Sequence, residues 1–132
     1  MKLRTMSAVA LAALLAASTV KHLRDPKFYY PVIPRSLSTD KNGAFALMSR
    51  SEWVAASAVP EAAAAVGLLL PATRKAAATA TAAMFTVFTV GHLAALKNAY
   101  GPRGSAEARR IHTIRLPLQV PLILWAWSLR RK

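Results

Sequence analysis

The sequence predicts an all-α fold: a transmembrane four-helix bundle with antiparallel, up-down topology. Two observations predict it. Apolar residues make up 55% of the chain and charged residues only 17%, whereas about a quarter of the residues in a soluble domain are charged. The apolar residues also gather into four runs, which basic, proline-containing segments separate. We therefore expect one membrane domain over residues 1–132, with helices at about residues 4–23, 51–70, 74–97 and 111–129.

The first helix is predicted from the apolar run 6–20, which Arg4 and Lys21 bound. This run is short for a hydrocarbon core of roughly 30 Å, but both cationic side chains can extend outward to the interface. A cleaved signal peptide is the alternative, because a charged start, an apolar stretch and the small residues 16–18 also fit that pattern. The connection that follows contains prolines at positions 26, 31 and 34, which prevent a continuous helix there.

The second and third helices are predicted to form a tight hairpin. Ser51 followed by Glu52 is typical of a helix start, and Pro71 ends the second helix. Thr73 is expected to cap the third helix, and a turn this short makes the two helices antiparallel neighbours. The fourth helix follows a polar loop at 97–110 that contains glycine and proline.

The charge pattern favours lipid as a partner and argues against nucleic acid. The formal net charge is +13, but the basic residues flank the apolar runs and do not line one face of any helix. Such residues lie at headgroup level, where they attract anionic lipids. The chain has no cysteine, which excludes disulfides and thiolate metal sites within it.

The predicted orientation follows from the same cations. With four crossings, both termini share one side of the membrane with the turn at Arg74 and Lys75. That side has seven Lys and Arg residues and the other side has eleven, so the raw count opposes a cytoplasmic N-terminus. The seven, however, lie in very short segments next to helix ends, where the positive-inside rule is counted. We therefore expect a multi-pass protein of the cell membrane, inner or plasma, with both termini in the cytoplasm.

Five polar residues inside or beside the apolar runs form the candidate site. Glu61 lies near mid-membrane, so it should be protonated, paired or facing a polar cavity. Arg115 and Gln119 are four residues apart, share a helix face, and are expected to meet Glu61. His92 and His22 should lie in the same half of the membrane. We expect no metal site, because no His-x-x-His or Glu-x-x-His spacing is present.

Two interpretations of this polar cluster stay open. It could form a proton-active or quinone-binding pocket, because quinone carbonyls accept hydrogen bonds from donors such as His and Arg. It could equally be an internal hydrogen-bonded clamp that holds the helices together. His112 is expected at the membrane interface. No soluble-type catalytic motif is present, so no catalytic residue is assigned.

Three segments resemble the DoxX-like family of small four-helix membrane proteins. They are residues 21–28 with 33–34, residues 60–61 with 67–74, and residues 115–121 leading to 125–127. The resemblance covers most of the chain, and the last segment is the most specific. It implies four helices, with His22, Glu61, Arg115 and Gln119 at matching positions. The family takes its name from a subunit linked to thiosulfate:quinone oxidation.

Three hypotheses for function follow. The first is an accessory or scaffold subunit that binds other membrane subunits, or a second copy of itself, in a larger complex. The second is a redox-linked subunit that binds quinone or relays protons, in which case it belongs to a quinone-linked oxidoreductase. The third is a small-solute transporter, which would require oligomerisation because one four-helix bundle does not make two gates.

Overall fold

The chain is helical throughout most of its length in the computed structural model, which describes residues 2–33, 37–44, 46–102 and 104–130. The α-helices are α1 (Leu3–Arg24), α2 (Arg50–Leu69), α3 (Arg74–Ala99) and α4 (Ala106–Ser128). Among the described residues between α1 and α2 lie the 3₁₀ helices η1 (Pro26–Val32) and η3 (Thr39–Lys41). The predicted all-α class is confirmed: the described ranges contain one isolated β-bridge, between Ser38 and Met48, and no strand.

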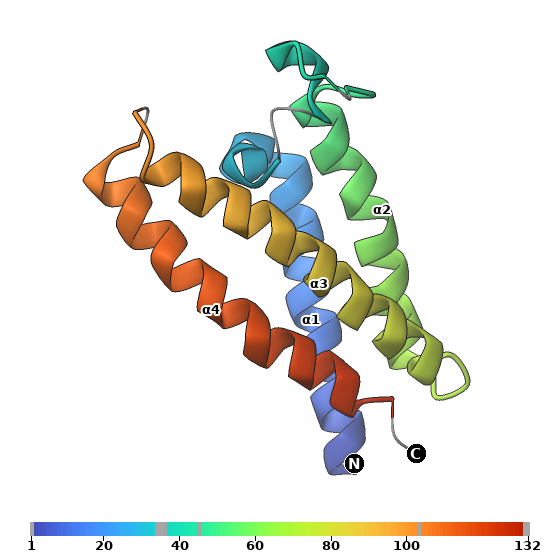
Figure 1. Cartoon of the computed structure of the whole chain (residues 1–132). Helices are drawn as coiled ribbons and strands as arrows, with labels where there is room; N and C mark the ends of the chain where they lie inside the picture. Colours follow the sequence, from blue (N-terminus) through green and yellow to red (C-terminus); the bar gives the residue numbers. More distant parts are fainter. Residues whose placement is uncertain (1, 34–36, 45, 103, 131–132) are drawn as a thin grey trace.

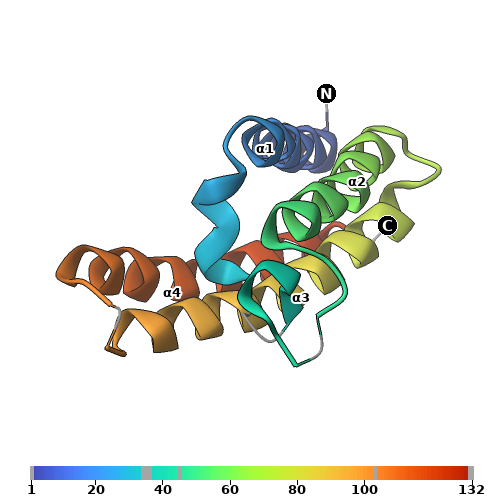
Figure 2. The same cartoon turned by 90° about the horizontal axis from the view of Figure 1, so that it is seen from above.

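Successive α-helices run in opposite directions, so the start of α1 and the end of α4 lie at the same end of the molecule (Figure 1). Seen from above, α1 and α2 lie on one side and α3 and α4 on the other, with η1 crossing between them (Figure 2). The packing agrees with this view, because α1 contacts mainly α2 and α3 contacts mainly α4. Contacts of α2 and of η1 with α3 join the two pairs.

Small side chains fill much of the core. Ala8, Ala12, Ala64, Ala78 and other alanines are buried together with a few leucines and Phe85. Small residues let helix backbones approach closely in lipid, where packing replaces the hydrophobic effect as the main driving force. Gly67 likewise allows α2 to approach α3 closely, because an added Cβ there would lie 2.8 Å from the Cβ of Ala77.

Two helix starts differ from the prediction, because polar residues outside the apolar runs cap them. The N-cap of α2 is Ser49, not Ser51: its side chain accepts a hydrogen bond from the Glu52 N–H, and Glu52 accepts one from the Ser49 N–H in return. Helix α4 begins at Ala106, ahead of the expected start near 111, because the hydroxyl of Ser105 accepts from the Ala108 N–H.

The turn between α2 and α3 is closed by its own side chains. Thr73 is the N-cap residue of α3, as predicted, but its hydroxyl makes no capping hydrogen bond to α3 and donates instead to the carbonyl of Gly67 at 2.8 Å. The buried Arg74 donates from Nε to the carbonyl of Leu68 at 2.9 Å. Both bonds satisfy carbonyls at the end of α2 that have no partner within the helix.

Three of the described helices are long and apolar enough to cross a membrane: α1, α2 and α3. Helix α4 is long enough, but charged residues such as Arg109, Arg110 and Arg115 lower its hydropathy. The structure therefore supports a membrane protein with at least these three candidate spans, and the fourth crossing is considered below.

Candidate functional site: a polar-lined cavity between the helices

A cavity of about 900 Å³ lies between the two helix pairs, and η1 contributes one of its walls. Each α-helix contributes apolar side chains to it, such as Leu15, Val54, Phe85 and Leu122. All five polar residues singled out from the sequence also line it: His22, Glu61, His92, Arg115 and Gln119. The cavity therefore has the composition of a small-molecule site, with an apolar wall and a few polar groups that converge on it.

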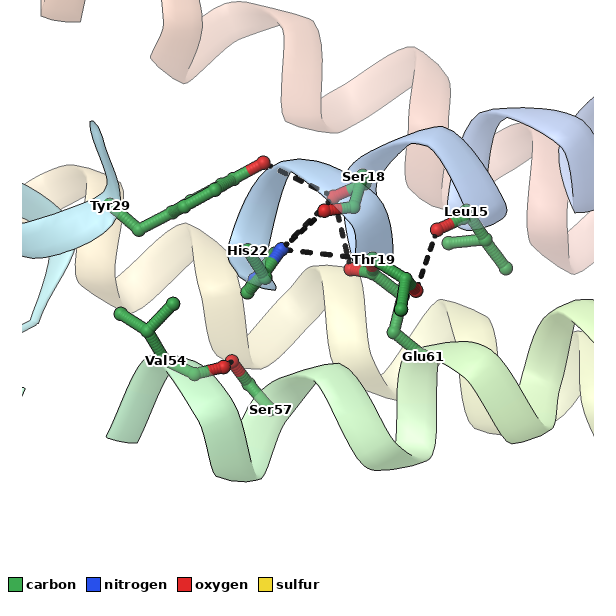
Figure 3. Close-up of polar contacts among 8 residues, drawn as sticks. All are labelled: Leu15, Ser18, Thr19, His22, Tyr29, Val54, Ser57 and Glu61. Carbon is green, nitrogen blue, oxygen red and sulfur yellow. Dashed lines mark hydrogen bonds and ion pairs between the residues drawn. The ribbon is translucent and has the colours of Figure 1, made fainter. Parts of the chain in front are cut away.

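Glu61 is buried and is held by α1 (Figure 3). Its two oxygens accept hydrogen bonds from the Ser18 hydroxyl at 3.2 Å and from the Thr19 hydroxyl at 3.0 Å. The Nδ1 atom of His22 lies 3.7 Å from Glu61 Oε1. One turn of α1 thus supplies every one of these contacts, because residues 18, 19 and 22 lie on the side of α1 that packs against α2.

The orientation of His22 is set by its own helix and by η1. Its Nδ1 lies 2.7 Å from the carbonyl oxygen of Ser18. A carbonyl only accepts, so Nδ1 carries the proton in this contact. The ring of Tyr29 stacks on the imidazole with the centroids 3.8 Å apart, and the Tyr29 hydroxyl lies 3.4 Å from Ser18 Oγ. Tyr29 therefore ties η1 to the same network as Glu61.

The expected direct contact of Glu61 with Arg115 and Gln119 is absent from the contacts among the described residues. The guanidinium of Arg115 instead lies over the ring of Phe28, 5.0 Å from its centroid. The buried Oε1 of Gln119 has no hydrogen-bond partner within the described part of the chain. The physical reason is the pairing of the helices: α2 packs on α1, α4 packs on α3, and the cavity lies between Glu61 and the polar face of α4.

In the α3–α4 pair, His92 and His112 each have a buried Nδ1 that makes no hydrogen bond to a described residue. His92 lines the cavity, and its Nδ1 makes no hydrogen bond among the described residues. It lies within electrostatic range of Arg115 and of His112. His112, which the sequence analysis placed at the interface, is buried with only 6% of its surface exposed. The early start of α4 explains this, because it places His112 in the second turn of a helix that packs against α3.

Ser18, Thr19 and Tyr29 are site residues that were not predicted from the sequence. Hydroxyl residues are common in apolar helices, where they bond to the preceding turn, as Thr19 also does to the carbonyl of Leu15. One signal was available: Ser18 and His22 are four residues apart and so share a face. Among the described residues, no three His, Asp or Glu side chains lie together where they could hold a metal ion.

The chain belongs to the DUF8561 family, a domain of unknown function, whose match covers residues 11–130. The match includes all five predicted site residues, all of α2, α3 and α4, and α1 from residue 11 onward. Comparisons with curated proteins and with solved structures found no match.

Proposed function

We propose that this DUF8561 protein is a four-span membrane subunit that binds a quinone-type molecule in the cavity and serves a larger redox complex. The observation that carries the proposal is the pairing of an apolar cavity with unpartnered polar atoms. Gln119 Oε1 and His92 Nδ1 are buried at its wall without hydrogen bonds from the described residues. Buried polar atoms without partners are costly, so a bound molecule that supplies the missing hydrogen bonds would be favoured there.

The chemistry of the lining fits a quinone better than a fully apolar molecule. A quinone has two carbonyl oxygens that only accept hydrogen bonds, and Arg115 has a guanidinium that only donates. Gln119 and His92 can each donate or accept, according to the rotamer of the amide and the tautomer of the ring. The surrounding wall of Phe85, Leu122 and similar residues suits the ring and the start of an isoprenoid tail. A volume of about 900 Å³ is in the usual range for a ligand of this size.

Glu61 and His22 are the groups that we assign to proton exchange. Quinone reduction consumes protons as well as electrons, and a carboxyl at the cavity wall can supply them. Glu61 accepts hydrogen bonds from Ser18 and Thr19, so its charged form is partly compensated inside the protein. His22 lies 3.7 Å from it and also lines the cavity.

The proposal that this chain is an accessory subunit is based on the absence of cysteine from its sequence. Without cysteine, thiol or iron–sulfur chemistry would come from another subunit. We therefore propose that electrons reach the quinone from a partner subunit. The relationship to the DoxX-like family is part of the same proposal, and it rests on the residues at 21–28, 60–61 and 115–121 that resemble that family.

We also propose that α4 is the fourth crossing. Its 23 residues extend about 35 Å at 1.5 Å per residue, which exceeds a hydrocarbon core of about 30 Å. Arg115 and Gln119, two of the polar residues that lower its hydropathy, line the cavity, so lipid need not solvate them. Four crossings would place both termini on one side, which the short basic segments next to the helix ends identify as the cytoplasm.

The test is to purify the protein in a mild detergent and to identify co-purifying quinones and proteins by mass spectrometry. We expect a bound quinone in the wild type and about tenfold weaker binding of a short-chain quinone to Arg115→Gln, because a hydrogen bond to a charged donor contributes about 1.5 kcal/mol or more. Arg110→Gln, in the exposed first turns of α4, is the matched control and should bind normally. Absence of both co-purified and added quinone from the wild type would contradict the proposal, and retained partners would then favour a scaffold.

A further inference from the structure

We propose a second site, distinct from the cavity: Arg4 and Arg130 bind the phosphate of an anionic phospholipid where the start of α1 meets the end of α4. The site goes beyond the proposed function and does not depend on it. It lies at the end of the molecule where α1 begins and α4 ends, next to the turn between α2 and α3 (Figure 1).

The two arginines are held in place by contacts with neighbouring helices. Arg4 of α1 donates from Nη2 to the carbonyl of Leu129 at 3.0 Å, and its Nε is buried without a hydrogen-bond partner among the described residues. Arg130, the next residue after Leu129, donates from Nε to the hydroxyl of Thr79 in α3 at 3.0 Å. Its guanidinium also lies 3.8 Å from the centroid of the Trp127 ring. Each guanidinium is therefore positioned by its contacts, and its terminal Nη groups, apart from the N–H that Arg4 gives to Leu129, can donate to a phosphate, whereas the buried Nε of Arg4 cannot.

The positive charge at this end is not balanced by acidic residues. The segments that form it, residues 2–7, 70–79 and 124–130, contain no Asp or Glu. The other end of the molecule differs: Lys21 pairs with Asp25 at 3.2 Å, and Glu52 and Glu107 lie in the first turns of α2 and α4. The cations of these segments therefore have no acidic side chain within the same segments that competes with a bound anion for their N–H groups.

The surrounding surface identifies a lipid as the source of the phosphate. Leu3 and Met6 of α1 and Leu124 and Trp127 of α4 are exposed there, with 81%, 53%, 62% and 49% of their surfaces accessible. These side chains lie within two helical turns of Arg4 or Arg130 along the chain, and they offer apolar contact to acyl chains. The indole of Trp125 donates to Ser7 at 2.8 Å, which joins α1 to α4 next to the same surface. Tryptophan and arginine together at a helix end are typical of the headgroup level of a bilayer.

Native mass spectrometry of the delipidated protein tests the site. The protein in detergent is mixed with equal amounts of phosphatidylglycerol and phosphatidylcholine that have the same acyl chains. We expect preferential retention of phosphatidylglycerol, reduced about fivefold in Arg130→Gln and largely preserved in Arg130→Lys, since each cation near anionic lipid contributes a factor of this order. Arg110→Gln, at the other end of α4, should retain the lipid as the wild type does.

Several results would overturn the site. Equal retention of the two lipids by the wild type would show that the headgroup charge is not recognised. Equal loss in Arg110→Gln and Arg130→Gln would show attraction to overall charge and not to a site. Displacement of the lipid by inorganic phosphate at equal concentration would identify a soluble anion as the ligand. Size-exclusion profiles of all variants establish that they are folded, and quinone binding by the same samples reports separately on the cavity.

Discussion

At the scale of single residues, the free-energy cost of burying Glu61 can be compared with the contribution of its hydrogen bonds. Hydrogen bonds between membrane helices contribute about 0.6 kcal/mol each on average, so those from Ser18 and Thr19 together return about 1 kcal/mol. A charged residue at the centre of a membrane helix costs about 3 kcal/mol on insertion scales. The Thr19 hydroxyl also has one proton for two acceptors, Glu61 and the carbonyl of Leu15. The hydrogen bonds of Glu61 therefore contribute less stabilising free energy than the burial of its charged form costs.

This balance predicts that Glu61→Leu is at least as stable as the wild type. The substitution removes the cost of burying a carboxyl and keeps an apolar side chain of similar length. Unfolding by SDS titration of the purified protein measures the effect, with Thr19→Val as a control that deletes one hydroxyl partner. A loss of about 2 kcal/mol or more in Glu61→Leu would instead identify Glu61 as part of a stabilising clamp.

At the residue scale, the signal in the sequence was the apolar environment of a few polar side chains. A carboxylate, an arginine and a glutamine in apolar runs could be recognised as exceptional, and all of them line the cavity. Their partners could not be recognised, because pairing depends on which helices pack together. Glu61 was expected to meet Gln119, but α1 lies against α2 and its hydroxyls reach the carboxyl first.

At the scale of elements, η1 is the segment whose position decides the shape of the cavity. It contributes Phe28, Tyr29 and Val32 to the wall and packs on both α2 and α3. Its approach to α3 depends on Gly91, where an added Cβ would collide with the carbonyl oxygen of Val32. The sequence excluded a continuous α-helix here because of its prolines, but a short 3₁₀ helix has no periodic pattern that could have predicted it.

We predict that Gly91→Ala displaces η1 from α3. Backbone cannot yield as a flexible side chain can, so overpacking should lower the free energy of unfolding by about 1–3 kcal/mol. Hydrogen exchange measured by mass spectrometry should rise in residues 26–33 while the core of α3 stays protected. Gly101→Ala is the control, because a Cβ there would meet the nearest carbonyl at 3.4 Å. Unchanged exchange at 26–33 in Gly91→Ala would show that this close contact does not hold η1 in place.

The central parts of the helices could be predicted from the apolar runs, while their ends depend on capping hydrogen bonds of single polar residues. Runs of apolar residues locate a helix because burial or lipid contact favours them over its whole length. Caps are single polar residues in the flanking loops, and several candidates stand next to each other. Ser49 and Ser51 are both reasonable caps by type, and only the reciprocal bonds with Glu52 distinguish them.

At the scale of the whole molecule, the alternating direction of the helices predicts which segments lie on the same side of the membrane. If α4 crosses the membrane, the start of α1, the turn between α2 and α3 and the end of α4 share one side. The connection between α1 and α2 and the loop before α4 share the other. If the first of these sides is the cytoplasmic one, as proposed, the lipid site faces the leaflet where anionic lipids are concentrated.

Single cysteines test this topology, since the chain has none of its own. We expect Lys2→Cys and Ala72→Cys to be protected from a membrane-impermeant maleimide in intact cells. Lys41→Cys, in the connection between α1 and α2, should be labelled. After the cells are opened, all three should react. The reverse pattern would contradict the cytoplasmic termini, and labelling of Ala72→Cys together with Lys41→Cys would contradict a hairpin of two full crossings.

The contacts between α1 and Glu61 have a consequence for how the protein is made. Chains are synthesised from the N-terminus, so Ser18, Thr19 and His22 leave the ribosome more than 30 residues before Glu61 does. A carboxyl that enters a bilayer alone must bring water or a proton with it, whereas Glu61 arrives where hydroxyls and an imidazole are already present. Helix α1 therefore provides hydrogen-bond donors for Glu61 before α2 enters the membrane. Insertion of α2 should depend on α1 being in the membrane first, and much less so when residue 61 is leucine.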